Sequence, residues 1–145
     1  ALFFAVSFGE LLRTEAVNLS WFNFNQTNIP LQVGGNEAAH LYGWRQTGGR
    51  FFGDYALVQR DTYDRYPAFY AAKLLARFTR DGDHVIAIES REPLLRAYGV
   101  RHDDGTVALL LVNTSPGDTF EVAVTLSSAR AEGKVQLLRY GIPQD

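Results

Sequence analysis

Trp21, Asn23 and Asn25 occupy alternate positions and carry the clearest chemical signal in the sequence. In an extended segment, alternate side chains point to the same side of the chain. The tryptophan ring offers a flat apolar surface, and the asparagine amides both donate and accept hydrogen bonds. A sugar needs both, because its C–H face is apolar and its rim carries hydroxyl groups. We interpret these residues as a candidate carbohydrate-binding cluster; the competing interpretation is a tryptophan that fills a core.

Trp44 lies in the long stretch that follows, from residue 25 to about residue 50. This stretch contains Pro30 and two glycine pairs but no clear secondary-structure pattern. Loops of this length are uncommon in compact domains unless they are functional or disordered, and the aromatic residues argue against disorder. Two interpretations stay open for Trp44: it lines the same cleft as Trp21, or it anchors the loop to the body of the protein.

Histidine and carboxylate spacing does not indicate a catalytic or metal site. The chain has no cysteine, and its three histidines lie too far apart to resemble a zinc site: His40, His84 and His102. A glycosidase needs two carboxyl groups across the scissile bond. None of the candidate glutamates pairs convincingly with another: Glu10, Glu15, Glu37 and Glu89. We therefore expect no catalytic residue, no metal and no cofactor in this chain.

The elements that position the Trp21 cluster follow from hydrophobic spacing. Residues 1–17 are predicted to form a helix that is apolar around most of its circumference, and such helices are usually packed on more than one side. Residues 18–24 are predicted to form a short aromatic strand. A helix, a strand, a long loop and a second helix follow the βα rhythm of a parallel sheet or barrel, where ligands bind at the loops after the strands.

The second helix, over residues 66–81, has the clearest start and stop signals. Asp64 is placed to cap it, Pro67 suits its first turn, and Gly82 suits its exit turn. Its apolar residues recur at helical spacing: Ala71, Leu74, Leu75 and Phe78.

After Gly82 the apolar residues alternate with polar ones. Five strands are predicted, at residues 84–90, 94–103, 106–114, 119–126 and 134–140. The sequence Asp103-Asp104-Gly105 predicts a hairpin turn, and the apolar run over 107–112 predicts a central strand covered on both faces. Five strands amount to most of a β-sandwich, which usually has seven or more.

Composition narrows the class of protein. The chain has 145 residues, 46% of them hydrophobic, and a net charge of −2, which indicates a globular protein without a nucleic-acid surface. No apolar run approaches the ~18–20 residues of a membrane span. The sequence contains no methionine and begins on an apolar run without a charged leader. We therefore expect the C-terminal part of a longer protein, and the cellular compartment stays open.

The order of these parts resembles the C-terminal part of retaining glycoside hydrolases that have a (β/α)8 barrel and an attached β-sandwich. Arabinofuranosidases, xylosidases and related clan A enzymes are built this way. The resemblance rests on three stretches and a Gly82-Asp83 exit turn: Ser20-Trp21-Phe22-Asn23, the segment from Tyr66 to Leu75, and the segment from Val107 to Ser115.

This resemblance implies a place for each element. Residues 1–17 would be the seventh barrel helix, 19–24 the eighth strand and 66–81 the eighth helix. Trp21 would then form the floor of the sugar subsite. The catalytic acid/base and the nucleophile would both lie outside this chain.

The expected fold is therefore the end of an α/β barrel (helix–strand–loop–helix), residues 1–82, followed by an all-β antiparallel sandwich, residues 83–145, as an incomplete part of a larger fold. The expected function is that of a glycoside hydrolase segment with four sugar-cleft residues: Trp21, Asn23, Asn25 and Trp44. The expected partners are a carbohydrate and the remainder of the parent enzyme, and we expect neither nucleic acid nor a membrane.

Two alternatives are kept. One is a non-catalytic carbohydrate-binding or structural β-sandwich module, although such a module does not need two long helices. The other is an unrelated α+β binding protein. That alternative predicts that residues 1–82 fold compactly by themselves, whereas the barrel hypothesis predicts exposed apolar surface on the first helix and strand.

Overall fold

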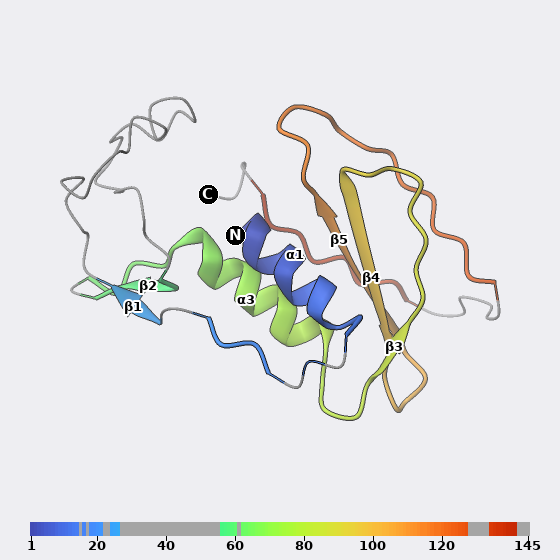
Figure 1. Ribbon diagram of the computed structural model, residues 1–145, viewed down its shortest axis with the longest axis horizontal. Coiled ribbons are helices and arrows are strands. Elements are labelled where there is room, and N and C mark those ends of the chain that lie inside the picture. The colour runs from blue at the N-terminus through green and yellow to red at the C-terminus, as the bar shows by residue number, and fades with distance from the viewer. Residues whose placement is uncertain are drawn as a thin grey trace.

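The computed structural model describes residues 1–14, 16, 18–21, 24–26, 56–60, 62–127 and 134–141. Its elements are, in chain order, α1 (Leu2–Leu11), β1 (Asn25–Gln26), β2 (Val58–Gln59), α3 (Pro67–Phe78), β3 (His84–Ile86), β4 (Leu95–Arg101) and β5 (Val107–Asn113). β3, β4 and β5 form an antiparallel sheet, and β1 and β2 form a separate parallel pair on the other side of the helices (Figure 1). The described part is a small mixed α/β unit.

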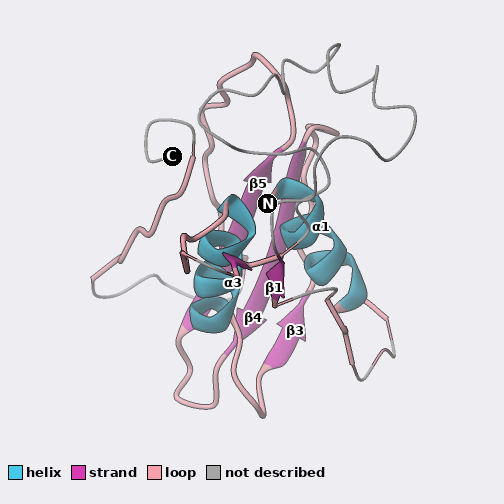
Figure 2. Cartoon of the chain, turned by 90° about the vertical axis from the view of Figure 1, so that its left-hand side faces the viewer, coloured by secondary structure: helices cyan, strands magenta, loops and turns pink. Residues whose placement is uncertain are grey.

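The two helices lie side by side on one face of the three-stranded sheet (Figure 2). Both contribute to a single hydrophobic core between the layers. Its buried members are Phe4, Ala5, Ala71, Leu75, Phe78, Tyr98, Val100 and Val112. The core therefore contains residues from both of the expected domains, 1–82 and 83–145, and the boundary between these domains stays a prediction.

α3 confirms most of its sequence signals. Pro67 lies in the first turn, and Ala71, Leu75 and Phe78 are buried against the core. The predicted cap is wrong. Tyr66 occupies the N-cap position without a side-chain cap bond, and the Asp64 carboxylate instead accepts a hydrogen bond of 2.6 Å from the Thr62 hydroxyl.

The end of α3 is shorter than predicted but leads into the expected turn. The helix ends at Phe78 rather than at residue 81. Gly82 has a φ of 85°, a left-handed value that is unfavourable for residues with a Cβ. This turn directs the chain from the helix layer into β3.

α1 and the strand after it differ from the prediction. α1 ends at Leu11 rather than at residue 17. The Thr14 hydroxyl donates a hydrogen bond to the Leu11 carbonyl and accepts one from the Ala16 N–H, so a side chain replaces the next helical turn. Residues 18–21 do not form a strand, and among the described residues parallel pairing occurs between β1 and β2, where Asn25 lies opposite Val58.

The sheet is narrower than a sandwich layer, and β4 is its central strand. β4 pairs with β5 from Leu95 opposite Asn113 to Arg101 opposite Val107. The prediction that 107–112 forms a central, doubly covered strand is wrong for the described residues. β5 lies at the edge, with one face against the helices and Leu111 on the other face 42% exposed.

Residues 119–126 and 134–140 are not strands in the described part of the chain, so the expected sandwich is not formed there. Most of their apolar residues remain exposed, from 40% at Leu138 to 90% at Val135. An alternating pattern of apolar and polar residues suits a segment to one face of a sheet. A strand also needs a neighbouring strand whose backbone N–H and C=O groups it can hydrogen-bond. These segments have no partner strand among the described residues.

The β4–β5 hairpin has the predicted turn. Gly105 has a φ of 84°, and its N–H donates to the His102 carbonyl at 2.9 Å. The His102 N–H donates to the Thr106 carbonyl at 2.8 Å, which closes the hairpin. The Asp-Gly signal is confirmed because only a residue without a Cβ takes this conformation at low cost.

Gly9 sets the distance between α1 and the sheet. A Cβ at this position would lie 2.4 Å from two atoms of the Tyr98 ring, closer than van der Waals contact allows. The glycine therefore lets the helix backbone rest directly on the tyrosine ring.

Replacing this glycine tests the contact. We expect Gly9→Ala to lower the free energy of unfolding by about 1–2 kcal/mol, because overpacking costs more than the gain in helix propensity. Urea denaturation measures the change. Gly117→Ala is the control, since nothing lies within 4 Å of a Cβ there. Equal stability of Gly9→Ala and the wild type would contradict the close contact.

Candidate functional site

Trp21, the centre of the predicted cluster, packs against α1. Its ring centroid lies 4.4 Å from that of the buried Phe4, with the rings tilted by 38°, and 6.1 Å from that of Phe3. Trp21 is half-buried at the edge of the core. Trp21 therefore makes the packing contact expected of a tryptophan that fills a core. A sugar would have to bind the part of the ring that stays exposed.

The other predicted site residues have different surroundings. Asn25 is half-buried and belongs to β1, where it pairs with Val58 of β2. Asn23 and Trp44 lie outside the described residues. Trp21 thus packs against α1, and Asn25 lies in the parallel pair. The four-residue cluster stays a prediction.

Tyr98 is the centre of a polar network that the sequence analysis missed. Its hydroxyl donates to Glu10 Oε1 at 2.9 Å, and the Arg13 guanidinium lies 4.9 Å from the ring centroid. Arg13 also donates to the Ala97 carbonyl at 2.8 Å and lies 3.7 Å from Glu10. The only sequence signal was the i, i+3 spacing of Glu10 and Arg13, which does not reveal a partner 84 or more residues away.

This network keeps the Tyr98 hydroxyl protonated. Burial, and then the hydrogen bond to the Glu10 carboxylate, raise the pKa of Tyr98 from 10.0 to about 12. A phenol with such a pKa donates a hydrogen bond at neutral pH but is a weak acid for proton transfer. Tyr98 and Glu10 therefore connect the sheet to α1.

Asp83 and His102 form a second pair that connects distant parts of the chain. The Asp83 carboxylate can only accept, so His102 Nδ1–H donates to Asp83 Oδ1, at 2.7 Å. The Arg80 N–H donates to the other carboxylate oxygen at 2.6 Å. His102 is predicted to be a sheet residue. In the structure it follows β4 directly and ties the hairpin to the exit turn of α3.

The surroundings of this pair favour a structural role. Burial raises the pKa of Asp83, but the hydrogen bonds from His102 and the Arg80 N–H lower it more, so the carboxyl ionises below its usual value of 3.8. Aspartate–histidine pairs orient an imidazole in some catalytic sites. Here both side chains are more than nine-tenths buried, so a substrate has little access to the ring.

The described residues contain neither a metal-binding group nor a membrane-spanning helix. In the residues that the structure describes, no three histidine or carboxylate side chains are grouped so that they could hold a metal ion. Neither described helix has both the length and the apolar content that a membrane crossing requires.

Comparison with protein families, with curated proteins and with solved structures gives no match.

Removing the Tyr98 hydroxyl tests the first network. We expect Tyr98→Phe to lower the free energy of unfolding by about 0.5–1.5 kcal/mol at pH 7, because one buried hydrogen bond is lost while the ring contact remains. The folded-state pKa is raised, so this contribution is complete below pH 10 and is lost as the pH rises to about 12. Urea denaturation across this pH range measures it. The control is Tyr63→Phe, at a tyrosine that is 72% exposed, and an equal loss in both variants would contradict the network.

Neutralising Asp83 tests the second pair. We expect Asp83→Asn to lower the Tm at pH 7, since a charge-assisted hydrogen bond becomes a neutral one. The folded-state pKa is lowered, so the wild-type advantage is present above pH 3.8 and disappears as the pH falls through the lowered pKa. Thermal unfolding at several pH values measures this. Asp81→Asn, at an exposed carboxylate in the same turn, is the control. A Tm difference that persists in strong acid would exclude the charge as its cause.

Proposed function

We propose that this chain is a segment of a glycoside hydrolase and contributes sugar-binding residues and an accessory β-structure. The observation that carries the proposal is the exposed apolar surface at the start of the chain. Leu2 is 54% exposed, Phe3 75% and Phe24 66%. The barrel hypothesis predicts such surface on the first helix and strand, whereas a self-contained α+β protein would bury these side chains. Further polypeptide covering α1 accounts for them best.

The β1–β2 pair supports the same proposal. Its two strands run parallel and contain two residues each. Parallel strands normally occur in larger sheets with both faces covered, because each strand needs neighbours on its edges and helices over its faces. A two-residue parallel pair fits the margin of such a sheet, as expected for a unit of a (β/α)8 barrel.

Two of the described carboxylates, Glu10 and Asp83, take part in contacts that hold the fold together. Glu10 accepts from Tyr98 and pairs with Arg13, and Asp83 is held by His102. Glycosidic hydrolysis needs two carboxyl groups that face each other across the bond to be broken, with an oxocarbenium-like transition state between them. Carboxylates that hold the fold together are not available for this work. In the proposal, the acid/base and the nucleophile come from the remainder of the parent enzyme.

Trp44 and Asn25 offer the best test of the sugar-binding role. In the protein that contains this chain, we expect turnover of at least one nitrophenyl pentoside or hexoside. Trp44→Ala should raise KM roughly tenfold with little change in kcat, because an aromatic anchor contributes binding rather than proton transfer. Asn25→Ala should act in the same direction. Trp21→Ala is a poor test, since it also removes the packing against Phe4.

The controls separate the alternatives. Tyr63→Ala removes an exposed aromatic side chain outside the predicted cluster, and KM should stay within about twofold of the wild-type value. Sugar binding without turnover would favour the non-catalytic module. Neither binding nor turnover over the whole panel would contradict the glycosidase proposal and favour an unrelated α+β protein.

A further inference from the structure

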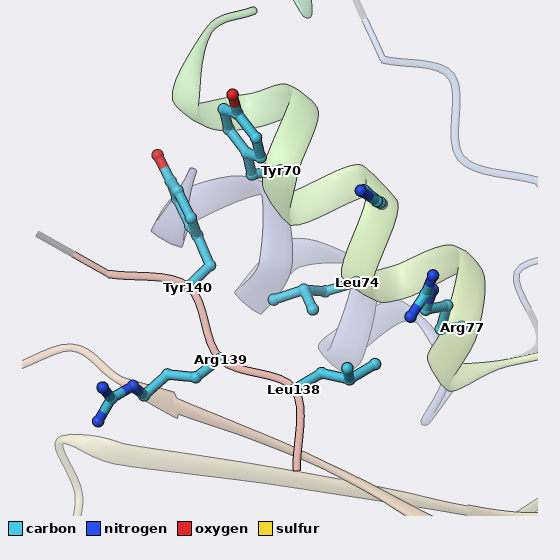
Figure 3. A pocket seen from close by; sticks show the side chains of 7 residues that line it. Tyr70, Leu74, Arg77, Leu138, Arg139 and Tyr140 are labelled. Atoms are coloured by element: carbon cyan, nitrogen blue, oxygen red, sulfur yellow. The ribbon is translucent and has the colours of Figure 1, made fainter. Parts of the chain in front are cut away.

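A pocket of about 260 Å³ opens between α3 and residues 138–140 near the C-terminal end of the described chain (Figure 3). Leu74 of α3 and Leu138 of the C-terminal segment approach each other across it and form its apolar part. At one end, the rings of Tyr70 and Tyr140 stack with centroids 5.0 Å apart and planes 17° from parallel. This stacking holds the C-terminal segment against the helix, so the pocket has walls from two distant parts of the chain.

The charged residues that line this pocket are all positive: Lys73, Arg77 and Arg139. This local excess is opposite in sign to the whole chain, whose net charge is −2. In the described part of the protein, no carboxylate lies within 4.0 Å of any of these three cations. Arg13, by comparison, is paired with Glu10. Positive charge is therefore gathered at this pocket, and no described carboxylate acts as its counter-ion.

The helix itself explains only part of this arrangement. Arg77 lies in the last turn of α3, where a cation interacts favourably with the helix dipole. Lys73 lies one turn earlier, and like charges at i and i+4 repel each other and weaken a helix. A bound anion between the two side chains would turn this repulsion into two attractive contacts.

We propose that this pocket binds a small organic anion. Its phosphate or carboxylate group would be held by Lys73 and Arg77, since a guanidinium can bind such a group through two parallel hydrogen bonds. Its flat or apolar body would pack on Leu74 and Leu138. Arg139 extends away from Arg77 in Figure 3 and adds positive potential from the opposite wall. The volume is below the ~300–1,000 Å³ of pockets for drug-sized ligands, which limits the ligand to a single ring or a body of similar size.

The proposal can be tested with simple probes on the unmodified chain. Phenyl phosphate and benzoate carry the two candidate anionic groups on the same flat body, and inorganic phosphate carries the charge without the body. Isothermal titration calorimetry should show that phenyl phosphate, benzoate or both bind more tightly than inorganic phosphate. The neutral phenyl β-glucoside should not bind at this pocket. The better of the two aromatic anions identifies the anionic group that the pocket takes.

Charge-removing variants locate the site. Lys73→Gln and Arg77→Gln should each weaken binding of the aromatic anion roughly tenfold, because each removes a charge-assisted contact. Both side chains are exposed, so the fold should persist, which circular dichroism checks. Arg91→Gln removes an exposed arginine that does not line the pocket, and it should leave the affinity within about twofold.

Three results would overturn the proposal. Equal weakening by Arg91→Gln would show a general charge effect. Affinity for inorganic phosphate equal to that for the better of the two aromatic anions would show that the leucines make no contact with the ligand. Absence of binding by both aromatic anions would exclude the site itself. The test does not depend on the glycosidase proposal, which a sugar panel and turnover decide separately.

Discussion

The contact between the Tyr98 ring and the backbone of Gly9 sets how closely α1 approaches the sheet. Tyr98 is 3% exposed, and its hydroxyl reaches past the glycine to the carboxylate of the adjacent residue, Glu10. The ring therefore packs against the helix at its face and bonds to it at its tip. Any change in this spacing would disturb Phe4 and Val100, because interiors are close-packed and transmit volume changes to their neighbours.

Polar contacts also join distant segments of the chain. Two carboxylates, Glu10 and Asp83, each hold two distant segments together. Both proposals assign binding roles to this chain.

Two surfaces of the molecule differ in character. Phe3 and Phe24 expose large apolar side chains, as expected where other polypeptide packs. At the α3 pocket, apolar side chains are combined with cations that have no ion-pair partner among the described residues, which is typical of a site for a small ligand with a charged end. The first surface supports the role of this chain as part of a larger assembly. The second supports a ligand site of its own.

The sequence by itself determined the features whose causes are local. Pro67 and the spacing of Ala71, Leu75 and Phe78 specify α3, and Asp104-Gly105 specifies the hairpin, since propensity and turn geometry depend on neighbouring residues. Only the tertiary structure decided the rest. It gave Trp21 a partner in Phe4, joined Asp83 to His102, and left residues 119–126 without a partner strand. Long-range pairing depends on which surfaces meet when the layers pack, and an alternating or amphipathic pattern shows that a surface must be covered without showing what covers it.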